Sequence, residues 1–116
     1  MLGICGSRDF TDYKYFKENV DKFVKEHKIT KIISGGCKGA DSLAKRYARE
    51  NKIEIVEHLP EWNKYGKSAG FVRNKLIVND SDYLLAFPLK GSKGTYITID
   101  LAKKKNIPVF IFQKSF

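Results

Sequence analysis

The sequence predicts an α/β fold with three layers, in which helices cover both faces of a five-stranded parallel sheet. Short apolar runs that end at glycine or proline alternate along the chain with segments whose apolar residues recur every three or four positions. A chain of 116 residues has the length of one domain, and an apolar fraction of 42% is enough for a packed core. We therefore expect residues 1–116 to form a single domain.

Five apolar runs are predicted to be strands. They lie at residues 1–5, 31–34, 53–58, 82–87 and 108–112. Glycine follows the first two runs and Pro88 follows the fourth, so each of these runs stops at a residue that strands disfavour. Pro108 begins the fifth run, a position that tolerates proline. Because a helix is predicted between each strand and the next, the crossovers are right-handed and the sheet is parallel.

Four segments show the apolar spacing of helices. They lie at residues 13–24, 43–48, 69–77 and 97–102. Thr11 or Asp12 is placed to cap the first of them. Residues 60–68 lack this spacing and are predicted to be a loop. Residues 103–105 are all lysine and follow the last helix, where the helix dipole favours cations.

The net charge of +9 comes mainly from lysine, because only four of the 22 basic residues are arginine. Arginine is preferred for bidentate recognition of phosphate and guanine, so this excess is weak support for a nucleic-acid partner. Much of it falls in and after two glycine-rich segments, which favours a small anionic ligand. Nucleic acid is therefore the less favoured partner class.

Other sequence features narrow the classes of protein. No apolar run approaches the ~18 residues of a membrane span, and no signal peptide is visible, so a cytoplasmic protein without membrane contact is expected. Cys5 and Cys37 are expected to be small buried residues. His27 and His58 are isolated, so no metal site is predicted.

The carboxyl ends of the predicted strands carry three glycine-bearing loops. Ligands of parallel sheets bind at these ends, near the point where the strand order reverses. In the first loop, Gly6 permits close approach of a ligand, Ser7 offers a hydroxyl and Arg8 offers a guanidinium that matches phosphate.

The second loop precedes a helix and contains three glycines. Gly35, Gly36 and Gly39 are expected to let backbone amides point at an anion, with Lys38 beside them. Asp41 would repel a phosphate, so two roles stay open for it. It either caps the helix or accepts hydrogen bonds from ribose hydroxyls.

The third loop has the same character. Gly91, Ser92, Gly94 and Thr95 are predicted to form an anion-binding nest at a helix N-terminus, and Lys90 and Lys93 would reinforce it.

Further polar and aromatic residues lie before and within the third predicted helix. Two roles stay open for the aromatic residues. Trp62 or Tyr65 covers a base or the mouth of a pocket, or else Trp62 fills the gap between the loop and the sheet. Arg73 is a second candidate for binding phosphate, and Asn74 lies beside it.

Four motifs together resemble the YspA-like family of the SLOG superfamily, which is named for its SMF/DprA and LOG members. They are Gly6–Phe10, Gly35–Asp41, Arg73–Asn74 and Ala86–Thr95, within a resemblance that extends from residue 2 to about residue 111. The resemblance implies a Rossmann-like domain that binds a nucleotide or a nucleotide-derived ligand, with no other cofactor identified. It implies that the ligand is lined by Gly6, Ser7, Arg8, Gly35, Gly36, Gly39, Asp41, Arg73, Asn74, Gly91, Ser92, Gly94 and Thr95.

The third loop departs from the LOG pattern P-G-G-x-G-T-x-x-E. Thr98 occupies the position of the glutamate, and Asp100 lies on another side of the helix. A threonine cannot stabilise a developing oxocarbenium charge, so the resemblance argues against phosphoribohydrolase activity by the LOG route.

The leading hypothesis is a sensor or processor of a nucleotide signal, and self-association is open. The alternative is a hydrolase that cuts an N-glycosidic or phosphate bond, for which Asp41 is the one candidate catalytic residue. The second alternative is single-stranded nucleic-acid binding, as in the DprA branch.

Overall fold

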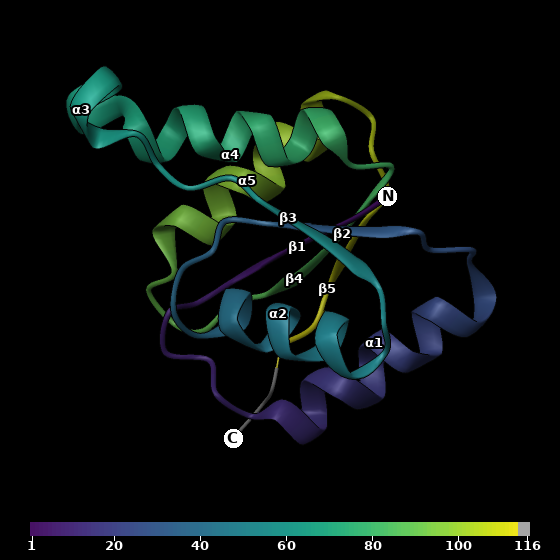
Figure 1. The fold of residues 1–116 in the computed structure, drawn as a ribbon. Coiled ribbons are helices and arrows are strands. Elements are labelled where there is room, and N and C mark those ends of the chain that lie inside the picture. Colours follow the sequence, from purple (N-terminus) through teal and green to yellow (C-terminus); the bar gives the residue numbers. More distant parts are fainter. Residues whose placement is uncertain (114–116) are drawn as a thin grey trace.

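The fold is built on one parallel sheet with the strand order β3-β2-β1-β4-β5. The computed structural model describes residues 1–113 (Figure 1). The strands are β1 (Leu2–Gly6), β2 (Lys31–Ser34), β3 (Glu54–Glu57), β4 (Tyr83–Phe87) and β5 (Val109–Ile111). The prediction of a five-stranded all-parallel sheet is confirmed.

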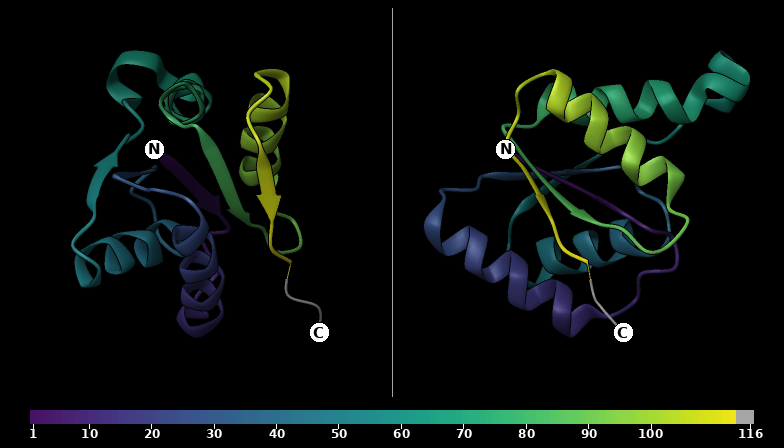
Figure 2. Two further views of the ribbon diagram at one scale, coloured as in Figure 1. Left: turned by 90° about the vertical axis from the view of Figure 1, so that its right-hand side faces the viewer. Right: turned by 180° about the vertical axis from the view of Figure 1, so that it is seen from behind.

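Helices flank the sheet on both faces, which completes the predicted three layers. They are α1 (Tyr13–Glu26), α2 (Ala40–Glu50), α3 (Trp62–Tyr65), α4 (Ala69–Asp80) and α5 (Lys93–Lys104), with a 3₁₀ turn η1 (Gly66–Ser68) before α4. Figure 2 shows α1 and α2 on one side of the sheet and α4 and α5 on the other. No helix within residues 1–113 has both the length and the apolar character to cross a bilayer.

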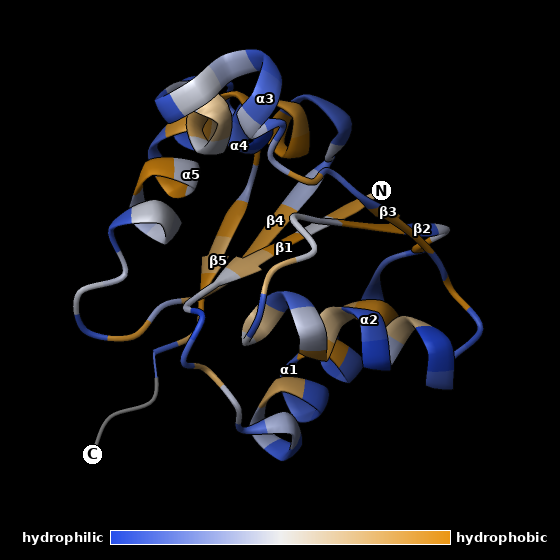
Figure 3. Ribbon diagram, turned by 60° about the vertical axis from the view of Figure 1, so that its left-hand side comes forward, coloured by the Kyte–Doolittle hydropathy of each residue, from blue (hydrophilic) through white to orange (hydrophobic). Residues whose placement is uncertain are grey.

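The core has two parts because neighbouring side chains of a strand point to opposite faces. Leu2 and Ile4 of β1 pack with the residues under α1 and α2, whereas Cys5 packs with those under α4 and α5. Phe16 and Tyr47 supply large buried rings from α1 and α2. Figure 3 shows apolar residues concentrated in the strands between these helices.

Asp12 caps α1, and Thr11 does not. The Tyr15 backbone N–H donates to Asp12 Oδ1 at 3.1 Å. This contact satisfies one of the N–H groups that the first helical turn leaves without a partner.

The prediction that residues 60–68 form a loop was wrong, because this segment contains α3 and η1. The Lys64 and Tyr65 backbone N–H groups both donate to the Glu61 carbonyl oxygen, at 3.1 and 3.0 Å. The side chains of residues 61–68 are all exposed, so no apolar spacing marks this helical turn in the sequence.

The strand order reverses between β1 and β4, since the chain runs outward from β1 to β3 and then returns to β4 beside β1. The loops after these two strands therefore diverge and leave room for a ligand. At this edge the loop after β2 lies against the loop after β1. The Ala40 backbone N–H donates to the Ser7 carbonyl oxygen at 3.1 Å, and Gly39 has a φ of +72°.

Gly39 cannot carry a side chain without moving the loop after β1. A Cβ there would lie 2.2 Å from the Ser7 carbonyl oxygen, whereas a Cβ on Gly91, whose φ is +83°, would meet nothing within 4 Å. We expect Gly39→Ala to lower the free energy of unfolding by about 3 kcal/mol or more, since backbone clash adds to strain. Gly91→Ala should show only the strain of a left-handed residue, about 1–2 kcal/mol. Urea denaturation followed by far-ultraviolet circular dichroism measures both, and equal losses would refute the close contact.

Candidate functional site

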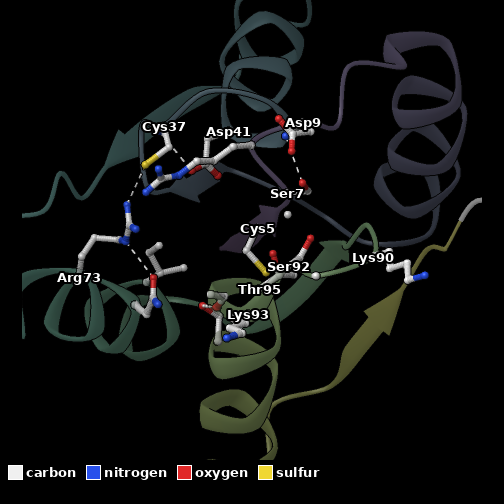
Figure 4. Close-up of a pocket in the computed structure, with 17 residues that line it drawn as sticks. Cys5, Ser7, Asp9, Cys37, Asp41, Arg73, Lys90, Ser92, Lys93 and Thr95 are labelled. Atoms are coloured by element: carbon white, nitrogen blue, oxygen red, sulfur yellow. Dashed lines mark hydrogen bonds between the residues drawn. The ribbon is translucent and has the colours of Figure 1, made fainter.

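A cavity of about 320 Å³ opens at the carboxyl ends of β1 and β4 (Figure 4). Its volume is at the lower end of the range for small-molecule sites. The cavity lies between the loops after β1 and β4, the first turn of α2, and α4 and α5. The predicted site residues that line it are Gly6, Ser7, Arg8, Asp41, Arg73, Asn74, Gly91, Ser92, Lys93, Gly94 and Thr95.

The loop after β1 is held against β4 and α2. The Ser7 backbone N–H donates to the Phe87 carbonyl oxygen at 3.1 Å, and Ser7 Oγ accepts the Asp9 N–H at 3.1 Å. A Cβ on Gly6 would lie 2.5 Å from the Ala40 side chain, so only glycine allows the loop and helix to meet here. Arg8 is exposed at the rim of the cavity.

The loop after β2 turns its polar groups inward, contrary to the predicted anion cradle. The Gly36 N–H donates to Ser34 Oγ at 3.3 Å and the Cys37 N–H to Asp41 Oδ2 at 3.2 Å, so these amides are already bound within the protein. Four predicted site residues of this loop do not line the cavity: Gly35, Gly36, Lys38 and Gly39. Gly35 and Gly39 instead permit close packing of this loop on its neighbours.

Arg73 is fixed by three hydrogen bonds within the protein. Its Nη1 donates to the Gly35 carbonyl oxygen at 3.1 Å and to Cys37 Sγ at 3.2 Å, and its Nε donates to Asn74 Oδ1 at 2.8 Å. A Cβ on Gly35 would lie 2.5 Å from Nη1, so the glycine makes room for the guanidinium. Arg73 thus ties α4 to the loop after β2 and also lines the cavity, and its role as the second candidate for binding phosphate stays a prediction.

Asp41 lies on the buried floor of the cavity and does not cap α2. The N-cap position is Gly39, which makes no side-chain capping bond, and Asp41 follows it in the first helical turn. Burial raises the pKa of Asp41 above its ordinary value, because the charged form loses water. The Cys37 backbone N–H and the Arg73 guanidinium lower the pKa and offset part of this effect.

The loop after β4 closes on itself before α5. The Leu89 N–H donates to Ser92 Oγ at 2.9 Å, and the Ser92 N–H donates back to the Leu89 carbonyl oxygen at 3.1 Å. Lys90 and Lys93 are exposed at the cavity edge, while Thr95, in the first turn of α5, is buried. This end of the cavity therefore combines a helix N-terminus with two cations.

The structure adds cavity residues that the sequence reasoning missed or left out of the site. They are Cys5, Asp9, Cys37, Ile77 and Thr98, whereas Lys90, which was expected to reinforce the nest of the third loop, also lines the cavity. Asp9 could have been predicted as a cavity residue from its position just after a predicted strand. Thr98 Oγ1 donates to the Gly94 carbonyl oxygen at 3.1 Å, so this hydroxyl is bound to the helix backbone.

The two cysteines are free thiols and differ in surroundings. Cys5 is buried as predicted, and burial raises the pKa of its thiol, which makes it a poor nucleophile. Cys37 is only half-buried and contacts Arg73, so the expectation of a buried cysteine was wrong at this position. Within residues 1–113, no group of three or more His, Cys, Asp or Glu is placed to hold a metal ion.

Trp62 does not fill a gap against the sheet, because 56% of its surface is exposed. It lies on α3 with Tyr65, which is 38% exposed, and neither residue lines the cavity. Figure 1 shows α3 projecting beyond the end of α4.

Comparison with known proteins places the chain in a family. Residues 3–65, which include the loops after β1 and β2, match the model of the YspA, cpYpsA-related SLOG family. The chain belongs to this SLOG family. The chain is also 37% identical over 87 residues to the Gene 61 protein of Mycobacterium phage D29, and the match covers 70% of each protein.

Solved structures share the fold of this SLOG protein. DNA processing protein A (DprA) from Streptococcus pneumoniae superposes with a TM-score of 0.80 at 20% identity, over 99% of this chain. DprA from Helicobacter pylori, described for its single-stranded DNA binding mode, has a TM-score of 0.73 at 20% identity, also over 99% of this chain. The chain spans 50% of the first DprA and 66% of the second. These likenesses establish the Rossmann-like fold.

The raised pKa of Asp41 predicts a specific pH dependence. The folded state holds the Asp41 proton more tightly than the unfolded chain does, so stability declines as pH rises from the ordinary value of 3.8 through the folded-state pKa. Asp41→Asn cannot ionise and should lack this decline. Urea denaturation between pH 4 and pH 8 compares the two proteins.

The control for loss of one negative charge is Glu18→Gln, since Glu18 is exposed on α1. The wild type should lose stability relative to Asp41→Asn as pH rises. If the stabilities of the wild type and Asp41→Asn changed in parallel with pH, the argument that burial raises the pKa of Asp41 would be contradicted.

Proposed function

We propose that the cavity binds a phosphorylated small molecule of the nucleotide class, and that the protein senses or processes this ligand. One observation carries the proposal: the cavity at the strand-order reversal has cations on its rim and uncharged polar groups and a carboxyl group on its buried floor. A ligand with a phosphate at one end and hydroxyl or base groups at the other matches this division of charge.

The phosphate would lie at the N-terminus of α5. The Ser92 and Lys93 N–H groups donate to the Leu89 and Gly91 carbonyl oxygens, at 3.1 and 2.9 Å, so the first turn offers the N–H groups of Gly94 and Thr95. The helix dipole adds a partial positive charge. Lys90 and Lys93 stand beside this turn, and Arg8 lies on the opposite loop. Gly91 and Gly94 have open space where a side chain would be, so the ligand can approach the backbone closely.

A hydrolytic function would have to use few groups. The buried thiol of Cys5 is a poor nucleophile, and the Thr98 hydroxyl is bound to Gly94. Asp41 is the carboxyl group on the buried floor, while the Asp9 carboxyl lies at an exposed position of the rim loop. Binding is therefore the function that the cavity supports best, with Asp41 as the candidate for any acid–base step.

Removal of the rim lysines tests the proposal. Lys90→Ala/Lys93→Ala should weaken binding of nucleoside 5′-monophosphates about tenfold, which corresponds to about 1.4 kcal/mol, because the phosphate loses two cations. Isothermal titration calorimetry at low salt measures the affinity.

Lys103→Ala/Lys104→Ala is the matched control, because it removes the same charge at the other end of α5. It should bind as the wild type does. If no phosphorylated nucleotide binds at millimolar concentration, or if both double variants lose affinity equally, the proposed site is wrong.

A second candidate function is binding of single-stranded DNA. It is favoured by the H. pylori DprA, which shares the fold and is described as binding such DNA, and by the net charge of +9. The exposed rings of Trp62 and Tyr65 on α3 would supply stacking surfaces for bases.

Trp62→Ala tests this candidate. Loss of one stacked base costs about 1–3 kcal/mol, so affinity for an oligothymidylate should fall by about tenfold in fluorescence anisotropy. Tyr96→Ala is the control, because Tyr96 is also exposed (41%) but lies on α5. Binding that is absent, independent of salt, or equal in both variants would reject the candidate.

A further inference from the structure

We propose that the floor of the cavity is a hydroxyl-binding subsite that selects ligands with vicinal hydroxyls, and therefore ribose over 2-deoxyribose. The proposal rests on the proposed function, because it concerns the same cavity. It is carried by three buried side chains, Asp41, Asn74 and Thr95, that line the floor from α2, α4 and α5. Figure 4 shows Asp41 and Thr95 entering the site from different sides.

Asp41 supplies the acceptor of this subsite. Asp41 is 9% exposed and borders the cavity, and its carboxyl group accepts backbone N–H groups from Cys37, at 3.2 Å, and from Gly35. A carboxylate has about four acceptor positions, so part of this capacity remains for a ligand. A phosphate would be repelled here, whereas a hydroxyl can donate its proton.

Asn74 supplies the donor, and Arg73 sets its direction. Arg73 Nε donates to Asn74 Oδ1 at 2.8 Å, and a guanidinium can only donate. The amide is therefore oriented with its oxygen toward Arg73, which leaves the Nδ2 hydrogens for another acceptor. Among residues 1–113, no group accepts them. Asn74 is 9% exposed and lines the cavity, so a ligand in the cavity is the acceptor available to it.

Thr95 adds a hydroxyl that can both donate and accept. It is 5% exposed, and in the part of the chain that the structure describes its side chain has no hydrogen-bond partner. Thr98, one turn later on α5, differs because its hydroxyl is bound to the Gly94 carbonyl oxygen. The first of these threonines is thus available to a ligand, and the second is not.

A pair of adjacent hydroxyls satisfies this set of groups. Each hydroxyl donates one hydrogen bond and accepts up to two, so a diol has the donors for Asp41 and the acceptors for Asn74 and Thr95. A carbon without a hydroxyl can neither donate nor accept a hydrogen bond, so it would leave the buried polar groups without partners. Sites built to bind a hydroxyl reject the analogue without it for this reason.

The experiment compares ligand pairs that differ by one hydroxyl. Ribose 5-phosphate and 2-deoxyribose 5-phosphate are titrated into the full chain by calorimetry, as are adenosine and 2′-deoxyadenosine 5′-monophosphates. The wild type should bind each ribose ligand about tenfold or more tightly than its deoxy partner. Asp41→Asn keeps an oxygen that can accept from Cys37 but removes the charge, and it should reduce this ratio to near one.

Thr95→Val is the second variant, because it keeps the shape of the buried side chain and removes the hydroxyl. It should reduce the same ratio, and a far-ultraviolet circular dichroism spectrum equal to that of the wild type separates a binding role from a folding defect. Glu18→Gln, exposed on α1, is the control and should keep the full ratio.

The outcomes distinguish the two proposals. Equal binding of ribose and deoxyribose ligands by the wild type overturns the hydroxyl subsite while the proposed function stands. Discrimination that survives in both Asp41→Asn and Thr95→Val overturns the assignment to these residues. Failure of every phosphorylated ligand to bind overturns the proposed function and the subsite with it.

Discussion

The guanidinium of Arg73 is the contact on which the geometry of the site depends. It bridges α4 to the loop after β2, 38 residues earlier in the chain, by binding the Gly35 carbonyl oxygen and Cys37 Sγ. Through Nε it also orients Asn74. Because the same loop donates the Cys37 N–H to Asp41, the arginine, the loop and the carboxyl group form one connected network. This network holds the buried polar floor in place and leaves part of its hydrogen-bonding capacity to a ligand.

The fold could be predicted from the sequence, because its elements are marked by local patterns and the connection rules of parallel sheets leave few arrangements. The position of the cavity could be predicted for the same reason, since ligands lie at the strand-order reversal. The direction of polar groups in the loop after β2 could not. The Cys37 N–H donates to Asp41 in a loop that Arg73 contacts from a distant helix, and no local pattern in the sequence marks that long-range contact. The helical turn α3 could not be predicted, because its residues are exposed and show no apolar pattern.

The charged residues that line the cavity differ in their depth below the protein surface. Three exposed cations of the cavity, Lys90, Lys93 and Arg8, stand on the rim, whereas the half-buried Arg73 is bound within the protein and the buried floor carries Asp41. The net charge of +9 therefore affects the long-range attraction of an anionic ligand more than the contacts that the bound ligand makes. Long-range attraction and short-range recognition are performed by different residues, and salt should affect the first more than the second.

The exposed position of Trp62 on α3 has a consequence for how this protein is observed. It is the sole tryptophan, and more than half of its surface is in contact with water. Its emission therefore reports the surroundings of one short surface helix instead of the packing of the core. An optical signal from this indole can change when α3 alone moves, and it can stay constant while the sheet loosens, so the intrinsic fluorophore serves as a local probe of the projecting turn.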